Sequence, residues 1–208
     1  SSLYISIRAF TQPGGGVIVQ QPVYPAFANA VLENSRVLLN NAVVNNGGYY
    51  TIDFEDFEQK AQLQDTRLFF LCSPHNPTGR VFTKQELERL SDICRANDVL
   101  IVADEIHADI IRSEQKFCPL AAAVDDDSHI ITCTGINKTF NTAGLHCSNI
   151  IIKDEKLRER YIKERGHSTP TPFAVSALLA AYNESEEWLE ELKAYFDETL
   201  RYIDGFLK

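Results

Sequence analysis

The chain has 208 residues, 44% of them hydrophobic and 24% charged, which is ordinary for a globular protein with one sizeable core. A formal net charge of -9 argues against the basic surface that nucleic-acid phosphates require, so we expect no nucleic-acid partner. No apolar run approaches the roughly 20 residues of a membrane-spanning helix, and no basic-then-apolar leader is present, so we expect no membrane span and no secretory signal.

Cysteine usage indicates a reducing compartment. The five cysteines are an odd number, are widely spaced and include no C-x-x-C pair. We therefore expect free, mostly buried thiols, no metal site and a cytoplasmic protein. The sequence contains no methionine and opens on Ser1-Ser2-Leu3, so we interpret it as an internal segment of a longer protein.

Six short runs of β-branched and apolar residues predict strands. In chain order they cover residues 17–20, 37–39, 68–72, 99–103, 130–133 and 149–152. Several of them are apolar on both faces, which is typical of a mainly parallel sheet with helices on each side.

Helix signals alternate with these strands. Asp53 is placed to cap one helix, and Thr83 with Glu86 forms the capping box of a second. A third helix begins at Ser185 and keeps apolar residues at helical spacing to the chain end. The alternation predicts an α/β fold, a three-layer sandwich with a mainly parallel sheet.

Four segments with chemical potential each follow a predicted strand, and ligands of an open α/β sheet collect outside the carboxyl ends of its strands. In Q-P-V-Y-P-A-F at residues 21–27, Tyr24 lies between two prolines and can present a rigid face to a planar ring. Packing in the core is the alternative for Tyr24 and Phe27. In L-C-S-P-H-N-P-T-G at residues 71–79, Asn76 can donate its amide to a phenolate-like oxygen, or it can form a structural Asx-turn before proline.

The third segment, V-L-I-V-A-D-E-I-H at residues 99–107, carries a carboxylate out of a buried strand. Such a carboxylate needs a cationic partner, so Asp104 suits a protonated ring nitrogen, with His107 near the same ring. The alternative is the D-E-x-H box of helicase-type ATPases, in which the acidic pair organises Mg²⁺. That alternative also requires an upstream G-x-x-x-x-G-K-[S/T] phosphate loop, which the sequence lacks.

The fourth segment, T-C-T-G-I-N-K-T-F-N-T-A-G-L at residues 132–145, contains a single lysine after a buried strand. Most lysines are solvated, but an amine that is shielded from water beside other positive charge becomes a nucleophile. Lys138 is the candidate for that role.

Taken together and in this order, P-x-Y-x-x-F, N-P-T-G, D-E-I-H and N-K-T-F-N-x-A-G-L resemble the fold-type-I pyridoxal-phosphate enzymes. Within them the chain is most similar to the cystathionine β-lyase/cystalysin branch of carbon–sulfur lyases, over essentially its whole length. The resemblance implies that the cofactor, pyridoxal 5'-phosphate, is bound by Tyr24, Asn76, Asp104, His107, Thr134 and Lys138.

The resemblance also implies a role for each of these residues. In that family the aromatic stacks on the pyridine ring, the asparagine and the histidine lie near its 3-oxygen, and the first acid pairs with the protonated ring nitrogen. A hydroxyl binds the phosphate. The lysine attaches the cofactor covalently through its amine, which makes Lys138 the catalytic residue.

The implied activity is a C–S β-lyase that converts cystathionine or cysteine S-conjugates, which are small sulfur-containing amino acids, to pyruvate, ammonia and a thiol. An aminotransferase is the alternative, and a catalytically silent or regulatory relative is a second one. Residues 1–183 would form the large, cofactor-binding domain of an aminotransferase-like fold, and residues 184–208 the start of a helix that leads to a small domain. A homodimer is implied as well.

The sequence departs from the family's pattern at the lysine. Asn137 precedes the lysine where serine is common, and Gly135 stands where relatives often carry a phosphate-binding serine, which leaves Thr134 as the candidate phosphate ligand. The family's glycine turn upstream of Ser1 and its small domain with the substrate-carboxylate arginine are not contained in this sequence. We therefore expect that this segment alone cannot turn over substrate.

Overall fold

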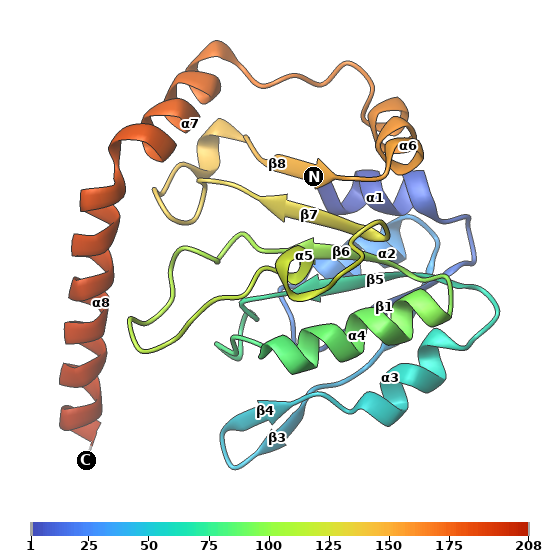
Figure 1. The fold of residues 1–208 in the computed structure, drawn as a ribbon, viewed down its shortest axis with the longest axis horizontal. Coiled ribbons are helices and arrows are strands. Elements are labelled where there is room, and N and C mark those ends of the chain that lie inside the picture. Colours follow the sequence, from blue (N-terminus) through green and yellow to red (C-terminus); the bar gives the residue numbers. More distant parts are fainter. Residues whose placement is uncertain (1, 208) are drawn as a thin grey trace.

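The computed structural model describes residues 2–207, and its centre is a six-stranded sheet (Figure 1). The strand order is β2-β1-β5-β6-β7-β8, and neighbours are parallel except for the antiparallel pair of β7 and β8. The strands are β1 (Gly16–Val19), β2 (Val37–Asn40), β5 (Thr66–Cys72), β6 (Leu100–Asp104), β7 (Ile130–Thr134) and β8 (Asn149–Ile152). All six predicted strands are confirmed, with ends that shift by at most two residues.

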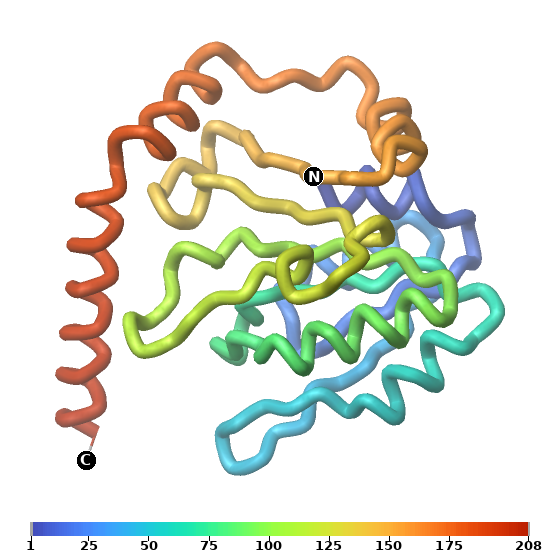
Figure 2. The backbone as a smooth tube through the Cα atoms, in the orientation of Figure 1, coloured from blue at the N-terminus to red at the C-terminus, as the bar shows by residue number. Residues whose placement is uncertain are grey.

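Helices cover both faces of this sheet (Figure 2). One face is covered by α1 (Ser2–Phe10), α2 (Ala26–Glu33) and α6 (Glu155–Arg165). The other is covered by α3 (Phe54–Ala61), α4 (Lys84–Ala96) and α5 (Leu120–Ala123). The molecule is therefore the three-layer α/β sandwich with a mainly parallel sheet that the sequence predicts.

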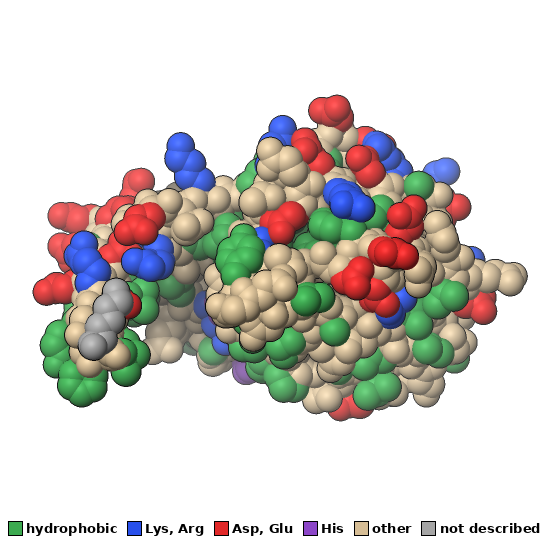
Figure 3. Space-filling model, turned by 90° about the horizontal axis from the view of Figure 1, so that it is seen from below, with side chains coloured by type: hydrophobic (Ala, Val, Ile, Leu, Met, Phe, Trp, Pro, Cys, Tyr) green, Lys and Arg blue, Asp and Glu red, His purple; other side chains and the backbone are tan. Residues whose placement is uncertain are grey.

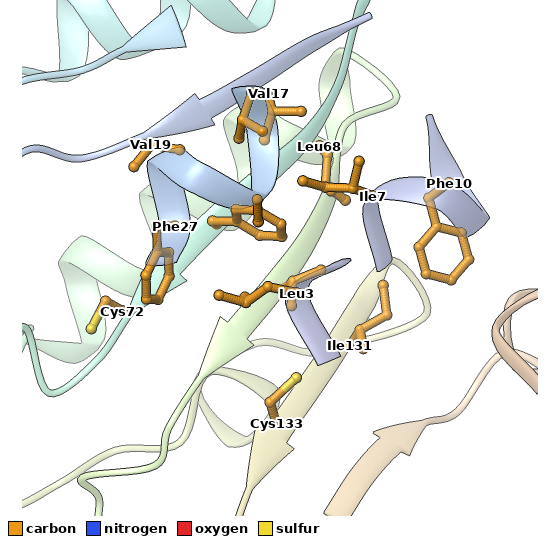
Figure 4. Packing of buried hydrophobic residues seen from close by; sticks show 14 of the residues in the cluster. Leu3, Ile7, Phe10, Val17, Val19, Phe27, Leu68, Cys72, Ile131 and Cys133 are labelled. Carbon is orange, nitrogen blue, oxygen red and sulfur yellow. The ribbon is translucent and has the colours of Figure 1, made fainter. Parts of the chain in front are cut away.

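Successive residues of the central strands pack into two separate cores. On β5, Leu68 and Phe70 pack on the side of α1 and α2, whereas Phe69 and Leu71 pack on the side of α3 and α4. Figure 4 shows the first core, in which Phe27 of α2 lies among side chains of α1 and the sheet. Because each such side chain contributes about 1.5–3 kcal/mol when buried, burial on both faces explains why these strands are apolar without alternation.

Both helix-capping signals form as predicted. Asp53 accepts a hydrogen bond from the backbone N–H of Asp56 (3.0 Å) at the start of α3. The Thr83 hydroxyl accepts from the N–H of Glu86 (3.2 Å), and the Glu86 carboxylate accepts from the N–H of Thr83 (2.7 Å), a complete capping box for α4. These side chains satisfy N–H groups that a helix start leaves without partners, and so they locate both helices along the chain.

A two-stranded hairpin, β3 (Val44–Asn46) with β4 (Tyr49–Thr51), is not predicted by the sequence. Its residues are largely exposed and mostly polar, so they carry no alternating apolar pattern. The hairpin is held by Arg80, whose guanidinium lies 4.3 Å from the centre of the Tyr49 ring and donates to the carbonyl oxygen of Tyr50. Arg80 is distant in sequence, so no local pattern could indicate this contact.

The chain ends in two helices, α7 (Pro172–Glu184) and α8 (Glu186–Leu207), at the side toward which the parallel strands point (Figure 1). The predicted helix start near Ser185 is confirmed, because its carbonyl oxygen accepts from the N–H of Leu189 (3.1 Å) in α8. Its hydroxyl instead donates to the carbonyl oxygen of Ala180 (3.2 Å), so Ser185 also ends α7.

Many apolar side chains of α7 and α8 are exposed, including Phe173, Tyr202 and Phe206. Figure 3 shows apolar side chains gathered at the free end of α8, beside the main body. Within residues 2–207 no helix combines the length and the apolar character that a membrane crossing needs.

Candidate active site

A cavity of about 820 Å³ opens at the carboxyl ends of the parallel strands, and all six predicted cofactor-binding residues line it. These residues are Tyr24, Asn76, Asp104, His107, Thr134 and Lys138. They come from the last residues of β6 and β7 and from the segments that follow β1, β5, β6 and β7, which are neighbours in the sheet. Because parallel strands bring their carboxyl ends to one edge, residues more than a hundred positions apart in the chain meet there.

The first two segments are joined by hydrogen bonds. The N–H of Tyr24 donates to the carbonyl oxygen of Asn76 (3.2 Å). His75, which is buried, bonds through Nε2 to the carbonyl oxygen of Gln20 (3.1 Å) and through Nδ1 to the hydroxyl of Thr78 (2.8 Å). A carbonyl can only accept, so Nε2 carries the proton and Nδ1 accepts from Thr78. Burial lowers the pKa of His75, which keeps it in this neutral form.

The two aromatic residues of the first segment have different environments. Tyr24 is 53% exposed at the cavity. Phe27 is 1% exposed and packs edge-on against Phe70, with ring centroids 5.8 Å apart. Core packing is thus correct for Phe27, while Tyr24 has a free ring face.

Asp104 is the last residue of β6, and the sheet register pairs it with Cys72 on one side and Cys133 on the other. Burial raises the pKa of the Asp104 carboxyl to about 6, although the N–H of Ile106 (3.3 Å) and the charge of Lys138 act in the opposite direction. Asp104 forms no salt bridge among the residues that the structure describes. A partly buried carboxylate without an ion-pair partner is suited to binding a cationic group.

The two thiols beside Asp104 are poor nucleophiles. Burial raises the pKa of Cys72 to about 12 and raises that of Cys133 as well, so both are neutral near pH 7. All five cysteines are free and four of them are buried, in agreement with the prediction from their spacing.

The acidic pair of D-E-I-H is split between two environments. Asp104 lines the cavity, whereas Glu105 is 4% exposed and accepts a hydrogen bond from the N–H of Leu120 (2.8 Å) at the start of α5. Burial raises the pKa of Glu105 to about 7. This separation does not suit joint binding of Mg²⁺. His107 lines the cavity, and burial together with the charge of Lys138 lowers its pKa, which favours a neutral imidazole.

Lys138 lies in a tight turn that follows β7. The N–H of Phe140 donates to the carbonyl oxygen of Ile136 (2.9 Å), and the N–H of Thr142 donates to that of Asn137 (3.1 Å). The Lys138 side chain is exposed to the cavity and has no hydrogen bond or salt bridge within the described part of the chain. The amine is therefore available to a ligand.

The structure shows the surroundings of Gly135 and Asn137, the two positions where the sequence differs from the family's usual serines. A Cβ atom on Gly135 would lie 3.3 Å from both the Cys147 carbonyl oxygen and the Ile106 side chain, so a serine there would be crowded. The amide oxygen of Asn137 is buried at the cavity and has no hydrogen-bond partner among residues 2–207. The Thr134 hydroxyl accepts a long hydrogen bond from the Asn149 amide (3.4 Å), and Thr134 lines the same cavity.

The three-layer fold and the cavity at the carboxyl ends of its strands agree with one protein family. The chain belongs to the aminotransferase class I and II family, whose model matches residues 1–208. It is 39% identical to the cystathionine β-lyase PatB of Bacillus subtilis over 100% of this chain and 54% of that protein. It is 32% identical to the protein MalY of Escherichia coli over 95% of this chain and 51% of that protein.

Solved structures agree. Cystalysin from Treponema denticola, which contains pyridoxal 5'-phosphate, superposes with a TM-score of 0.95 at 34% identity and covers 99% of this chain and 53% of its own. The pyridoxal-phosphate-bound C–S lyase from Staphylococcus hominis gives a TM-score of 0.94 at 37% identity, with 99% and 52% covered. The chain spans about half the length of the relatives it matches. The family prediction is confirmed, and the helicase-type ATPase alternative is wrong.

Proposed function

We propose that this chain forms the cofactor-binding domain of a pyridoxal-phosphate-dependent C–S β-lyase. Its substrate would be cystathionine or a related cysteine S-conjugate, which with water gives pyruvate, ammonia and a thiol. The observation that carries the proposal is that six residues from four distant segments surround one cavity, in a chain 39% identical to a cystathionine β-lyase. In the intact enzyme, residues 1–183 would belong to the large domain and residues 184–208 would lead to a small domain.

The residues at the cavity fit pyridoxal phosphate. A volume of about 820 Å³ suits a cofactor with a small substrate. Asp104 is a part-buried carboxylate without a salt bridge in the described chain, and Lys138 is an amine without a hydrogen bond there. Tyr24 offers an exposed ring face. These groups match the ring nitrogen, the aldehyde and the planar ring of the cofactor.

The other polar residues would orient the cofactor. Asn76 would donate its amide to the ring's 3-oxygen, and the neutral imidazole of His107 would lie beside the same oxygen. The Thr134 hydroxyl would donate to the phosphate. Because Tyr24 is linked to the Asn76 segment by a backbone hydrogen bond, the stacking face and the amide would keep a fixed relation.

Bound pyridoxal phosphate supplies an electron sink for the charge that develops at the substrate Cα when a proton leaves. Asp104, ionised above a pH of about 6, would hold a proton on the ring nitrogen and so maintain that sink. Lys138 Nζ would take up the Cα proton as general base. Both groups line the same cavity, so one bound substrate can meet both functions.

An aminotransferase is the second candidate. Gly135 and Asn137 near the lysine differ from the residues that are usual in the lyase branch, and this difference is the reason to retain it. Aspartate aminotransferase of Sulfolobus acidocaldarius is 27% identical over 100% of this chain. The two reactions share their early steps, and a difference in barrier of about 1.4 kcal/mol switches the outcome tenfold. A catalytically silent relative would bind the cofactor and catalyse neither reaction.

The test uses the intact protein with L-cystathionine and, separately, with an amino acid plus an α-keto acid. Equal amounts of pyruvate and thiol from the first incubation support the lyase. A new amino acid from the second incubation, without thiol from the first, makes the protein an aminotransferase. Neither product, in protein that binds the cofactor, makes it a silent relative.

We also propose a cytoplasmic homodimer. Five free cysteines suit a reducing compartment, and the exposed apolar side chains of α7 and α8 suit contact with further protein. Sedimentation of the intact protein at two concentrations tests the oligomeric state, and a monomer at both would contradict it.

A further inference from the structure

The two segments that carry the reactive groups are connected by one side-chain hydrogen bond. The hydroxyl of Thr139, the residue after Lys138, donates to the carboxylate of Asp109 (2.8 Å), two residues after His107. Thr139 is 2% exposed. Within residues 2–207 we find no other side-chain hydrogen bond between the segment that follows β6 and the turn that follows β7.

The bond lies where the sheet no longer holds the two segments together. The last backbone link is the N–H of Glu105 on the carbonyl oxygen of Cys133 (2.9 Å). Beyond it no backbone hydrogen bond joins the two segments within residues 2–207, and Asp104, His107 and Lys138 line the cavity. The Thr139–Asp109 hydrogen bond is therefore a link between the two segments beyond the end of the sheet.

Each end of the contact belongs to a turn that backbone hydrogen bonds close. On one side the N–H of Ala108 donates to the carbonyl oxygen of Glu105 (3.0 Å), and the N–H of Ile110 donates to that of His107 (3.1 Å). On the other side, backbone hydrogen bonds close the turn from residue 136 to residue 142 around Lys138. The position of Asp109 relative to Thr139 therefore sets the position of His107 relative to Lys138.

We propose that Asp109 and Thr139 are positioning residues whose hydrogen bond holds the Lys138 amine at a fixed place opposite Asp104 and His107. This inference rests on the proposed function, because the amine needs a fixed place only if it binds the cofactor. The carboxylate of Asp109 acts as an acceptor, and it forms no salt bridge with a lysine or arginine within the described chain.

The chain offers matched variants for a test. Thr139→Val removes the donor and keeps the shape of the side chain, and Asp109→Ala removes the acceptor. Thr139→Ser keeps the donor, and Asp109→Asn keeps an acceptor oxygen while it removes the charge. Ser113→Ala is the control, because Ser113 lies in the same segment but bonds to Asp197 of α8 instead.

The readouts are binding and structure as well as rate. Apo-protein of the intact enzyme is titrated with pyridoxal phosphate by absorbance, covalent attachment is measured by mass after borohydride reduction, and apo-protein melting is recorded for every variant. We expect Thr139→Val and Asp109→Ala each to weaken cofactor binding up to about tenfold, the upper end of what one hydrogen bond contributes without any effect of charge. The double variant should bind the cofactor no more weakly than the single variant with the lower affinity, because the two substitutions remove the same contact.

The conservative variants decide between a hydrogen bond and a charge effect. Thr139→Ser, Asp109→Asn and Ser113→Ala should bind the cofactor within about twofold of wild type, since they keep the contact. If Asp109→Asn binds as weakly as Asp109→Ala, the contact acts through charge and the inference is wrong. If wild type binds at Lys138 and Thr139→Val binds equally well, the inference alone fails. If wild type binds no cofactor at Lys138, the proposed function fails and the inference with it.

Discussion

The cavity has two walls that are built differently. One wall consists of the segments after β1 and β5, with Tyr24 and Asn76, and a backbone hydrogen bond and the buried His75 hold it together. The other wall consists of the segments after β6 and β7, with Asp104 and Lys138. The second wall carries a carboxylate and a lysine amine, and beyond the sheet one side-chain hydrogen bond links its two segments within residues 2–207.

In the proposed function, the first wall would orient the cofactor and the second wall would carry the reacting groups. The first wall presents a ring face and an amide, which need no change of protonation to act. The second wall presents groups whose protonation matters, and burial shifts the pKa of Asp104 upward and that of His107 downward. Damage to the first wall should therefore appear mainly as lost stability and weaker binding, and damage to the second wall mainly as lost chemistry.

Removal of the amine should have the largest effect. Lys138→Ala should abolish covalent attachment of the cofactor and lower kcat/KM by about 10²–10⁴-fold, the usual contribution of a general base. Borohydride reduction with peptide mass mapping and initial rates are the measurements. Lys153→Ala is the control, because Lys153 pairs with Asp127 at the surface (2.5 Å). Cofactor mass on a lysine other than Lys138 would overturn the assignment.

Asp104→Asn should lower the rate by at least about tenfold, because the ring nitrogen loses the carboxylate that keeps it protonated. The fold should remain intact. Steady-state rates with L-cystathionine and circular dichroism of the same preparation are the measurements. A variant that keeps the wild-type rate would remove Asp104 from the reaction.

The same variant tests the pKa of Asp104 through stability. The carboxyl has a folded pKa of about 6, above its ordinary value of 3.8, so its ionised form destabilises the folded apo-protein at pH 7. Wild-type apo-protein should gain stability relative to Asp104→Asn as the pH falls from about 7 to 4, because the folded carboxyl binds its proton first. Urea unfolding at several pH values is the measurement, and a stability difference that is independent of pH would contradict it.

In the first wall, His75→Leu should cost about 2–3 kcal/mol of unfolding free energy, because it leaves the Gln20 carbonyl and the Thr78 hydroxyl without their partner. The stabilisation that the His75 hydrogen bonds give the wild-type protein should decrease as the pH falls below about 6.5. The folded pKa of His75 is lowered, so the unfolded chain takes up the proton first. Denaturant unfolding checks both. Equal stability of the two proteins at pH 8 would show that the hydrogen bonds of His75 contribute nothing to the free energy of unfolding.

The smallest effect is expected at Gly135, next to the second wall. Gly135→Ser would place its Cβ 3.3 Å from Cys147 O and Ile106 Cδ1, so we expect a loss of about 1 kcal/mol of stability. Cofactor binding should not improve despite the added hydroxyl. A variant that is more stable than wild type and binds the cofactor more tightly would mean that the neighbouring chain gives way to serine.

Much of this molecule follows from local patterns. The six strands, both helix caps and the helix start near Ser185 could be predicted because apolar periodicity and capping act over a few residues. The candidate site could be predicted in part for the same reason. Tyr24 between prolines and a lysine after a buried strand are visible in the sequence, and the rule that ligands collect at the carboxyl ends of strands brings them together.

What only the tertiary structure decided depends on contacts between distant segments. Three such contacts join residues about 30 or more positions apart. They are the hydrogen bonds of His75 to Gln20, of Arg80 to Tyr50 in the hairpin, and of Thr139 to Asp109. The different environments of Asp104 and Glu105 are also visible only in the structure, because Glu105 accepts a hydrogen bond from the distant N–H of Leu120. Local propensity carries no information about such pairs. Their partners are chosen by the register of the parallel strands and by the requirement that buried polar groups find hydrogen bonds.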